Sequence, residues 1–135
     1  MKPTVIRKSA VLVSLFLLLS AAVLAQAVRR IRFPAGRTTV VLKGTLRGSA
    51  DVTYLLRASK GQTLTAHLSV PRNEYASLLI NDPAGTRLTN NKGEDASDDY
   101  SVTLPRTGDY KLVVFPPDTA DRRDVAHYAL EVTVR

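Results

Sequence analysis

The amino-acid sequence predicts an all-β fold, an antiparallel, jelly-roll-like β-sandwich of seven to eight strands. Through most of the 135 residues, apolar and polar side chains alternate with a period of two, the pattern of strands that bury one face. Turns rich in glycine, proline and aspartate separate the alternating runs, which recur about every ten residues. No long stretch has the spacing of an amphipathic helix, and many short strands at this spacing are typical of sandwiches.

The N-terminal segment, residues 1–27, is predicted to be a cleavable signal peptide. Three basic residues begin it, an apolar run from Ala10 to Leu24 follows, and Ala25-Gln26-Ala27 supplies a small-x-small cleavage pattern. The run is about 15 residues long, whereas a bilayer span takes about 20, so an uncleaved anchor is the weaker interpretation. We therefore expect export, to the periplasm of a Gram-negative source, of one domain over residues 28–135 without stable membrane insertion.

Four strands are predicted in the first part of this domain, over residues 39–47, 51–58, 63–70 and 75–81. The alternation is clearest in residues 63–70, where one face is apolar and the other carries threonine, histidine and serine. Gly44, inside the first of these strands, indicates a β-bulge.

Three further strands are predicted over residues 100–104, 110–115 and 127–134, each with a tyrosine and aliphatic residues on one face. Two segments interrupt the pattern. Residues 90–99 are polar and acidic, and residues 116–126 form a loop that begins with two prolines. Loops of this length in a compact domain often carry function, so both segments are candidates for a site.

The composition excludes several classes of function. The chain has no cysteine, which rules out disulfides and thiolate metal sites. Its formal net charge is +7, but three basic residues belong to the predicted signal peptide and the others are interspersed with acids. Nucleic-acid-binding proteins concentrate basic residues on one face, so we expect no nucleic-acid partner. No glycine-rich phosphate loop precedes a helix, and we expect no cofactor.

We expect neither catalysis nor metal binding. His67 and His127 are the only histidines, and neither has a local arrangement of serine or aspartate that suggests a catalytic triad. A small secreted enzyme, the alternative, would need one of them beside a nucleophile in a pocket. The acidic residues of segment 94–99 have the oxygen ligands that calcium prefers, but their spacing fits no EF-hand loop, which favours a solvated loop.

Two segments form the predicted partner-binding site. The first is the turn Thr107-Gly108-Asp109-Tyr110, in which Tyr110 either buries its ring in the core, the favoured interpretation, or contacts a partner. The second is the pair Arg122 and Arg123 on the proline-containing loop. Exposed arginines are often only solvated, but they also form bidentate contacts with carboxylates and are enriched at binding hot spots.

Segments spread along the chain carry a resemblance to known families. They are Phe33-Pro34-Ala35-Gly36, Lys43-Gly44-Thr45-Leu46-Arg47-Gly48, Tyr54, Lys60-Gly61-Gln62, Leu104-Pro105, the turn from Thr107 to Tyr110, and Tyr128-Ala129-Leu130-Glu131-Val132. In this order they resemble the bacterial periplasmic inhibitors of g-type lysozyme, from about Ile31 to Val134. They are also similar to the bacterial pre-peptidase C-terminal domain, a β-sandwich with much the same turns.

The resemblance to the inhibitors implies a mechanism and a protein partner, a g-type lysozyme. Those inhibitors carry a Ser-Gly-x-Tyr-type motif on one loop, where this chain has Thr107 to Tyr110, and arginines on a second loop, where it has Arg122 and Arg123. The two loops of a rigid sandwich would enter the lysozyme cleft and block substrate. The other resemblance implies a non-inhibitory accessory module of the envelope or of carbohydrate enzymes. The stand-alone domain and the long arginine-bearing loop favour the inhibitor.

Overall fold

The computed structural model describes residues 28–135, so the predicted signal peptide, residues 1–27, lies outside the described residues. Residues 28–135 form eight β-strands, and this part of the chain contains no helix that could cross a membrane. The strands are β1 (Val28–Arg30), β2 (Thr39–Arg47), β3 (Val52–Ala58), β4 (Thr63–Ser69), β5 (Ser77–Asn81), β6 (Asp99–Thr103), β7 (Gly108–Phe115) and β8 (Val125–Val134).

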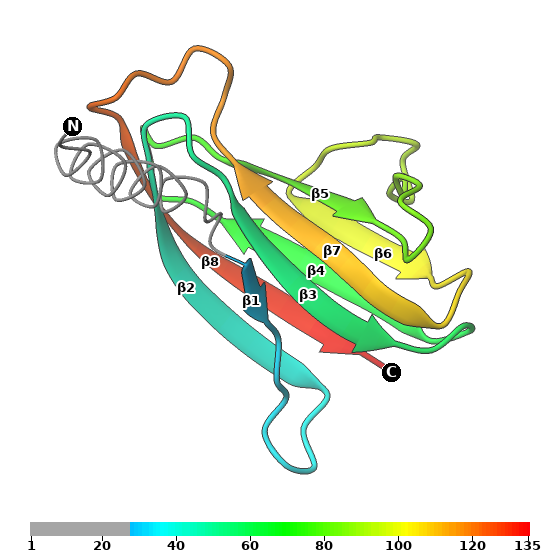
Figure 1. The fold of residues 1–135 in the computed structure, drawn as a ribbon. Helices are drawn as coiled ribbons and strands as arrows, with labels where there is room; N and C mark the ends of the chain where they lie inside the picture. The colour runs from blue at the N-terminus through cyan, green and yellow to red at the C-terminus, as the bar shows by residue number, and fades with distance from the viewer. Residues whose placement is uncertain (1–27) are drawn as a thin grey trace, which may run out of the picture.

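The strands form two four-stranded sheets that pack face to face (Figure 1). One sheet has the order β1-β3-β7-β5 and the other the order β2-β8-β4-β6. Consecutive strands therefore always belong to different sheets, and every connection crosses from one sheet to the other. All pairings are antiparallel except that of β1 with β3, which is parallel. The all-β sandwich predicted from the sequence is confirmed.

The core lies between the sheets and is built from alternate residues of each strand. Burial along β4 follows the predicted alternation residue by residue, with Leu64, Ala66 and Leu68 inside. The largest fully buried side chains come from both sheets: Tyr100, Tyr110, Leu46, Leu56, Leu64, Leu78, Ile80, Leu104, Leu112, Leu130, Val114 and Val132. Removing this apolar surface from water is the main stabilising term of a domain that has no disulfide.

The predicted bulge at Gly44 is wrong. The register of β2 with β8 is continuous from Thr39 to Arg47, and Gly44 pairs directly with Tyr128. The Tyr128 ring lies over the glycine backbone, so a Cβ at position 44 would overlap the phenol. The Tyr128 hydroxyl is hydrogen-bonded to that of Tyr54 across the core, at 2.7 Å. Glycine is needed here because an aromatic ring occupies the place of its side chain.

The long β5–β6 connection protects an edge of the sandwich. It runs back beside β5, where the Leu88 amide donates to the Ile80 carbonyl at 2.8 Å and the Ser97 amide to the Leu78 carbonyl at 3.0 Å. Unpaired edge strands are aggregation sites, and this return covers one of them. The buried side chain of Asn90 orders the turn at residues 90–94 through hydrogen bonds to backbone and to Glu94.

The strand directions place the loops at two opposite ends. The β2–β3 turn (residues 48–51), the β4–β5 loop (70–76) and the β7–β8 loop (116–124) meet at one end, called here the arginine end. The β3–β4 turn (59–62) and the β6–β7 turn (104–107) meet at the other, called here the opposite end. In Figure 1 the arginine end is at upper left and the opposite end at lower right.

Candidate functional site

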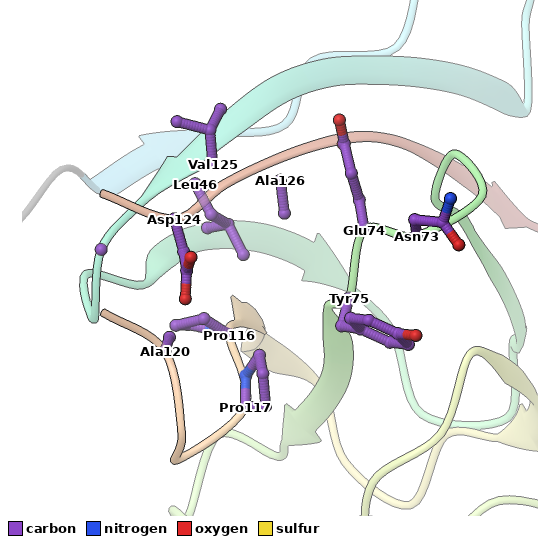
Figure 2. A pocket seen from close by; sticks show the side chains of 11 residues that line it. Leu46, Asn73, Glu74, Tyr75, Pro116, Pro117, Ala120, Asp124, Val125 and Ala126 are labelled. Carbon is purple, nitrogen blue, oxygen red and sulfur yellow. The ribbon is translucent and has the colours of Figure 1, made fainter. Parts of the chain in front are cut away.

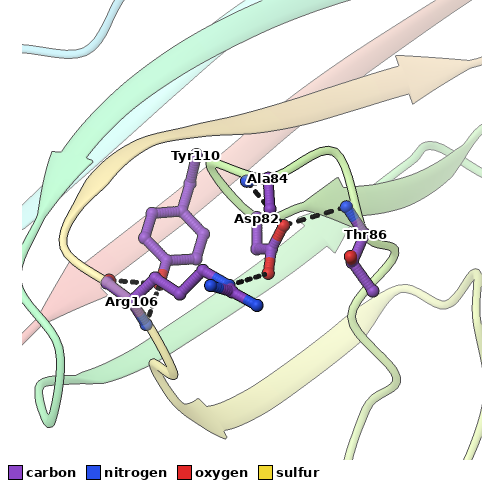
Figure 3. Close-up of polar contacts among 5 residues, drawn as sticks. All are labelled: Asp82, Ala84, Thr86, Arg106 and Tyr110. Carbon is purple, nitrogen blue, oxygen red and sulfur yellow. Dashed lines mark hydrogen bonds and ion pairs between the residues drawn. The ribbon is translucent and has the colours of Figure 1, made fainter.

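Tyr110 is a core residue. Its side chain is fully buried, and its hydroxyl donates to the Arg106 carbonyl at 2.6 Å and accepts from the Arg106 amide at 3.1 Å (Figure 3). A phenol that is hydrogen-bonded on both sides to the preceding turn holds that turn against the core. Of the two interpretations of Tyr110, the structure supports the structural one, because the ring does not reach the molecular surface.

A second interaction ties the same turn to the β5–β6 connection. Arg106 Nε donates to Asp82 Oδ2 at 3.2 Å, and Asp82 Oδ1 accepts the amides of Ala84 and Thr86 at 2.9 Å each (Figure 3). The Asp82 side chain is 4% exposed, so the carboxylate of this ion pair is shielded from water. The network fixes the β6–β7 turn to the start of the β5–β6 connection.

The other three residues of the turn are also engaged within the domain. Thr107 Oγ1 accepts the Lys60 amide at 2.9 Å, and Gly108, at φ +152°, packs under Pro83 where a Cβ would lie 2.8 Å from the ring. The Asp109 carboxylate accepts two 3.1 Å hydrogen bonds from the Arg30 guanidinium, which lowers the pKa of Asp109. The turn therefore shapes the opposite end, and the Arg30–Asp109 ion pair links β1 to β7.

Arg122 and Arg123 are the central residues of a well-defined β-turn. The Asp124 amide donates to the Asp121 carbonyl at 3.0 Å, and Asp124 Oδ2 accepts the Asp121 amide at 2.7 Å. The Gly48 amide donates to the Asp124 carbonyl at 2.9 Å and anchors the turn to the β2–β3 turn. Both arginines are exposed, and within residues 28–135 neither makes an ion pair or a side-chain hydrogen bond. The turn thus presents two cations that have no ion-pair partner among residues 28–135, on a backbone held by hydrogen bonds.

The structure does not bring the two predicted segments together. Thr107 precedes β7 and the arginine turn follows it, so the eight residues of β7 separate them. At about 3.3 Å per residue the separation is roughly 25 Å. Thr107, Gly108, Asp109 and Tyr110 belong to the opposite end, and Arg122 and Arg123 to the arginine end (Figure 1).

The arginine end also holds a cleft of about 250 Å³ (Figure 2). All three loops of this end contribute to its lining: Leu46, Gly48, Asn73, Glu74, Tyr75, Pro116, Pro117, Ala120, Asp124, Val125 and Ala126. Alternation had assigned Tyr75 to a strand, but β5 begins only at Ser77, and Tyr75 lies on the preceding loop with 71% of its surface exposed. The sequence signal for this loop is Pro71-Arg72-Asn73, a loop-forming run that ends two residues before Tyr75.

Glu74 fixes the loop that carries Tyr75. Its carboxylate accepts the His127 amide at 2.6 Å and contacts His127 Nδ1 at 3.0 Å, and these bonds lower the pKa of Glu74. His67 is likewise hydrogen-bonded to a carboxylate, that of Asp99. Among residues 28–135, no group of three or more histidines and acids could hold a metal ion.

Comparison with known proteins gives a likeness in fold. No protein-family profile and no curated protein matches the chain. Among solved structures, PliG of Aeromonas hydrophila, a periplasmic inhibitor of g-type lysozyme, is 23% identical with a TM-score of 0.67, over 81% of this chain and 96% of the inhibitor. PliG of Salmonella Typhimurium, also a g-type lysozyme inhibitor, is 21% identical with a TM-score of 0.61, over 82% and 100%.

A solved structure of another kind shares the architecture less closely. The pre-peptidase C-terminal domain of Bacillus anthracis collagenase is 13% identical with a TM-score of 0.50, over 82% of this chain and 97% of that domain. Both resemblances stated from the sequence are therefore confirmed at the level of the fold.

Proposed function

We propose that this chain is an exported protein inhibitor of a lytic glycosidase, g-type lysozyme, which it inhibits by occluding the active-site cleft. The observation that carries the proposal is the turn with Arg122 and Arg123, two exposed cations on a hydrogen-bonded backbone that form no ion pair within residues 28–135. The fold supports it, because the likeness spans nearly the whole length of inhibitor chains that contain no further domain in the compared structures.

The chemistry of the target explains why arginines suit this role. Glycosidases of this kind cleave with carboxylic side chains that line the substrate cleft. A guanidinium binds a carboxylate through two parallel hydrogen bonds, and opposite charge on the facing surfaces speeds association and fixes orientation. A turn that is already ordered by its own hydrogen bonds loses little entropy on docking. Inhibition then requires no chemistry of the inhibitor, only exclusion of the glycan.

The remaining sequence predictions complete the proposal. Residues 1–27 would direct export to the periplasm and be removed, leaving residues 28–135 as the inhibitor. Arg122 and Arg123 would contact the lysozyme. Thr107, Asp109 and Tyr110 would hold the opposite end of the sandwich in shape through their side-chain hydrogen bonds within the domain, and Gly108 through its close packing under Pro83.

A cell-wall lysis assay tests the function. The full chain would be exported by a bacterial host, purified in its processed form and titrated against g-type, c-type and i-type lysozymes. We expect inhibition of the g-type enzyme near one-to-one stoichiometry. Arg122→Ala with Arg123→Ala should raise the inhibition constant at least tenfold and leave the melting temperature nearly unchanged, because both side chains are solvent-exposed.

The control is a pair of exposed arginines remote from the turn, Arg32→Ala with Arg37→Ala, which should inhibit as well as the parent. A parent protein that inhibits none of the three lysozymes would refute the proposal and favour the accessory module. An arginine-turn variant that inhibits fully would remove this turn from the contact surface.

A further inference from the structure

We infer that this chain associates with a second copy of itself, the arginine turn (residues 121–124) of each copy binding in an acidic groove of the other. The acidic groove lies at the arginine end, beside the cleft described above, and shares only Pro116 and Pro117 with its lining. The inference goes beyond the proposed function, and its test requires no lysozyme.

The acidic groove combines apolar side chains of one sheet with polar side chains of two loops. Its volume is about 390 Å³, and it is lined by Ser49, Asp51, Leu79, Val113, Phe115, Pro116, Pro117 and Asp118. Leu79 of β5 and Val113 of β7 are direct cross-strand neighbours, and they alternate with buried residues, so they lie with Phe115 on the outer face of the sheet. All three are half-buried and leave apolar surface for a partner to cover.

Charge specifies what this groove binds. The only charged side chains in its lining are the carboxylates of Asp51 and Asp118, and within residues 28–135 neither forms an ion pair or a side-chain hydrogen bond. A cation complements them. Arginine suits the groove best, because its guanidinium binds a carboxylate through two hydrogen bonds and stacks on an aromatic ring such as Phe115, while its stem covers apolar surface.

The chain carries such cations next to the groove. Arg122 and Arg123 are exposed and form no ion pair in the described part of the chain. The β2–β3 turn connects the two features. A Cβ on Gly48 would lie 3.3 Å from Arg122 Cα, and the residues that follow in the same turn, Ser49 and Asp51, line the groove. The arginines and their complement are therefore neighbours on one surface.

This surface is mixed in charge, so it selects a pairing of groups rather than a net charge. Asp121 and Asp124 flank the arginines within the turn, and the Asp124 carboxylate is already used by the Asp121 amide at 2.7 Å. A surface with cations beside their complement pairs with itself about a two-fold axis, and every favourable contact then occurs twice. Exposed ion pairs are individually weak and are screened by salt, so we expect the dimer to be reversible and salt-sensitive.

Sedimentation equilibrium of the processed protein measures the association. We expect a dimer whose dissociation constant rises at least tenfold between about 0.05 M and about 0.5 M sodium chloride. Two charge-reversed variants should each remain monomeric, because like charges would meet in their dimers. The turn-reversed variant is Arg122→Glu with Arg123→Glu, and the groove-reversed variant is Asp51→Lys with Asp118→Lys. All four side chains are exposed, so the fold should be kept.

An equimolar mixture of the two variants gives the decisive result. The reversed turn of one variant meets the reversed groove of the other, and the unchanged turn and groove meet at the second contact, so a heterodimer should form with an affinity comparable to that of the parent dimer. Such a rescue also shows that both variants are folded. The control is Arg32→Glu with Arg37→Glu, exposed arginines of the β1–β2 connection, which should associate like the parent and should not pair selectively with the groove-reversed variant.

Three results would overturn the inference: a parent that is monomeric at every protein and salt concentration, a groove-reversed variant that dimerises like the parent, or a mixture that stays monomeric. Association would cover the arginine turn, so a dimer could not contact lysozyme through it, a consequence that rests on the proposed function. The two proposals fail separately. A parent that associates as described but inhibits no lysozyme refutes the function alone, and an inhibitor that is always monomeric refutes the dimer alone.

Discussion

Tyrosine hydroxyls are the main polar contacts inside this core, and each fixes a particular part of the chain. Tyr54 and Tyr128 join the two sheets hydroxyl to hydroxyl. The Tyr100 hydroxyl donates to a carbonyl of β5 and to one of the β5–β6 connection, and that of Tyr110 donates to the β6–β7 turn. Burial raises the pKa of Tyr100 to about 12, so its phenol stays a neutral donor at physiological pH. Buried polar groups are tolerated when they are hydrogen-bonded, and within residues 28–135 no buried side-chain nitrogen or oxygen lacks a partner.

Tyr110→Phe tests whether this tyrosine acts in stability rather than in contact. The substitution keeps the ring in the core but leaves the Arg106 amide and carbonyl without their partner, which should lower the free energy of unfolding by about 1–2 kcal/mol. Urea unfolding measures this loss, and the inhibition constant should not change. Tyr75→Phe is the control for stability, with an effect within about 0.5 kcal/mol because the side chain is exposed. Loss of inhibition at parental stability would return Tyr110 to the contact surface.

At the scale of strands and loops, the alternation of apolar and polar residues predicted where strands lie in the sequence but not how they pair. Seven of the eight strands were predicted within two residues at each end, because the period of two reports which face of a strand is buried. β1 was missed, since its three residues are all exposed and carry no alternation. The pairing was not predictable from neighbouring runs, because no strand pairs with the next one in the sequence.

The candidate site likewise has a part that local sequence predicted and a part that depends on tertiary contacts. Arg122 and Arg123 were found from composition and loop length alone, whereas the cleft beside them is formed by three loops that are distant in the sequence. Alternation placed Tyr75 on a strand that begins two residues later. Tertiary contacts such as the Glu74–His127 pair, 53 residues apart, decide where that loop lies, and no local pattern reports them.

The β4–β5 loop should loosen in acid because its anchor is a carboxylate. The pKa of Glu74 in the folded chain lies below its ordinary value of 4.5, chiefly because the carboxylate accepts the His127 amide. Its contribution to stability is therefore complete above about pH 4.5 and is lost as the pH falls through the lower, folded value.

Glu74→Gln measures this contribution. The difference in denaturation midpoint between parent and variant should be present at pH 5 and shrink below pH 4.5 as the parent loses its carboxylate. Hydrogen exchange of the His127 amide should accelerate in the same window. Glu131→Gln is the matched control, because the Glu131 carboxylate accepts no hydrogen bond within the described residues. A difference that persists unchanged at pH 3 would mean that Glu74 does not anchor the loop through its charge.

At the scale of the whole molecule, the alternation of consecutive strands between sheets distributes the loops. Each end gathers loops from distant parts of the chain, and the continuous ladders of the sheets hold the two ends apart. A sandwich of this kind can present one end to a partner while the other end is used for its own stability. The arginine end has arginines that form no ion pair within the described part of the chain, an exposed tyrosine and a cleft, whereas the side chains of Arg106, Thr107 and Tyr110 at the opposite end are hydrogen-bonded within the domain.

The two ends should therefore respond independently to substitution. Thr107→Ala with Asp109→Ala removes the bond to the Lys60 amide and the clip to Arg30, so it should lower stability and speed hydrogen exchange in β1 without changing inhibition. Arg122→Ala with Arg123→Ala should weaken inhibition and leave stability and hydrogen exchange in β1 unchanged. Combined, the four substitutions should change the free energy of unfolding by the sum of the two pairs within about 0.5 kcal/mol, because the sites are far apart and share no partner. A loss of inhibition from the Thr107 and Asp109 pair, at unchanged fold, would mean that lysozyme contacts the opposite end.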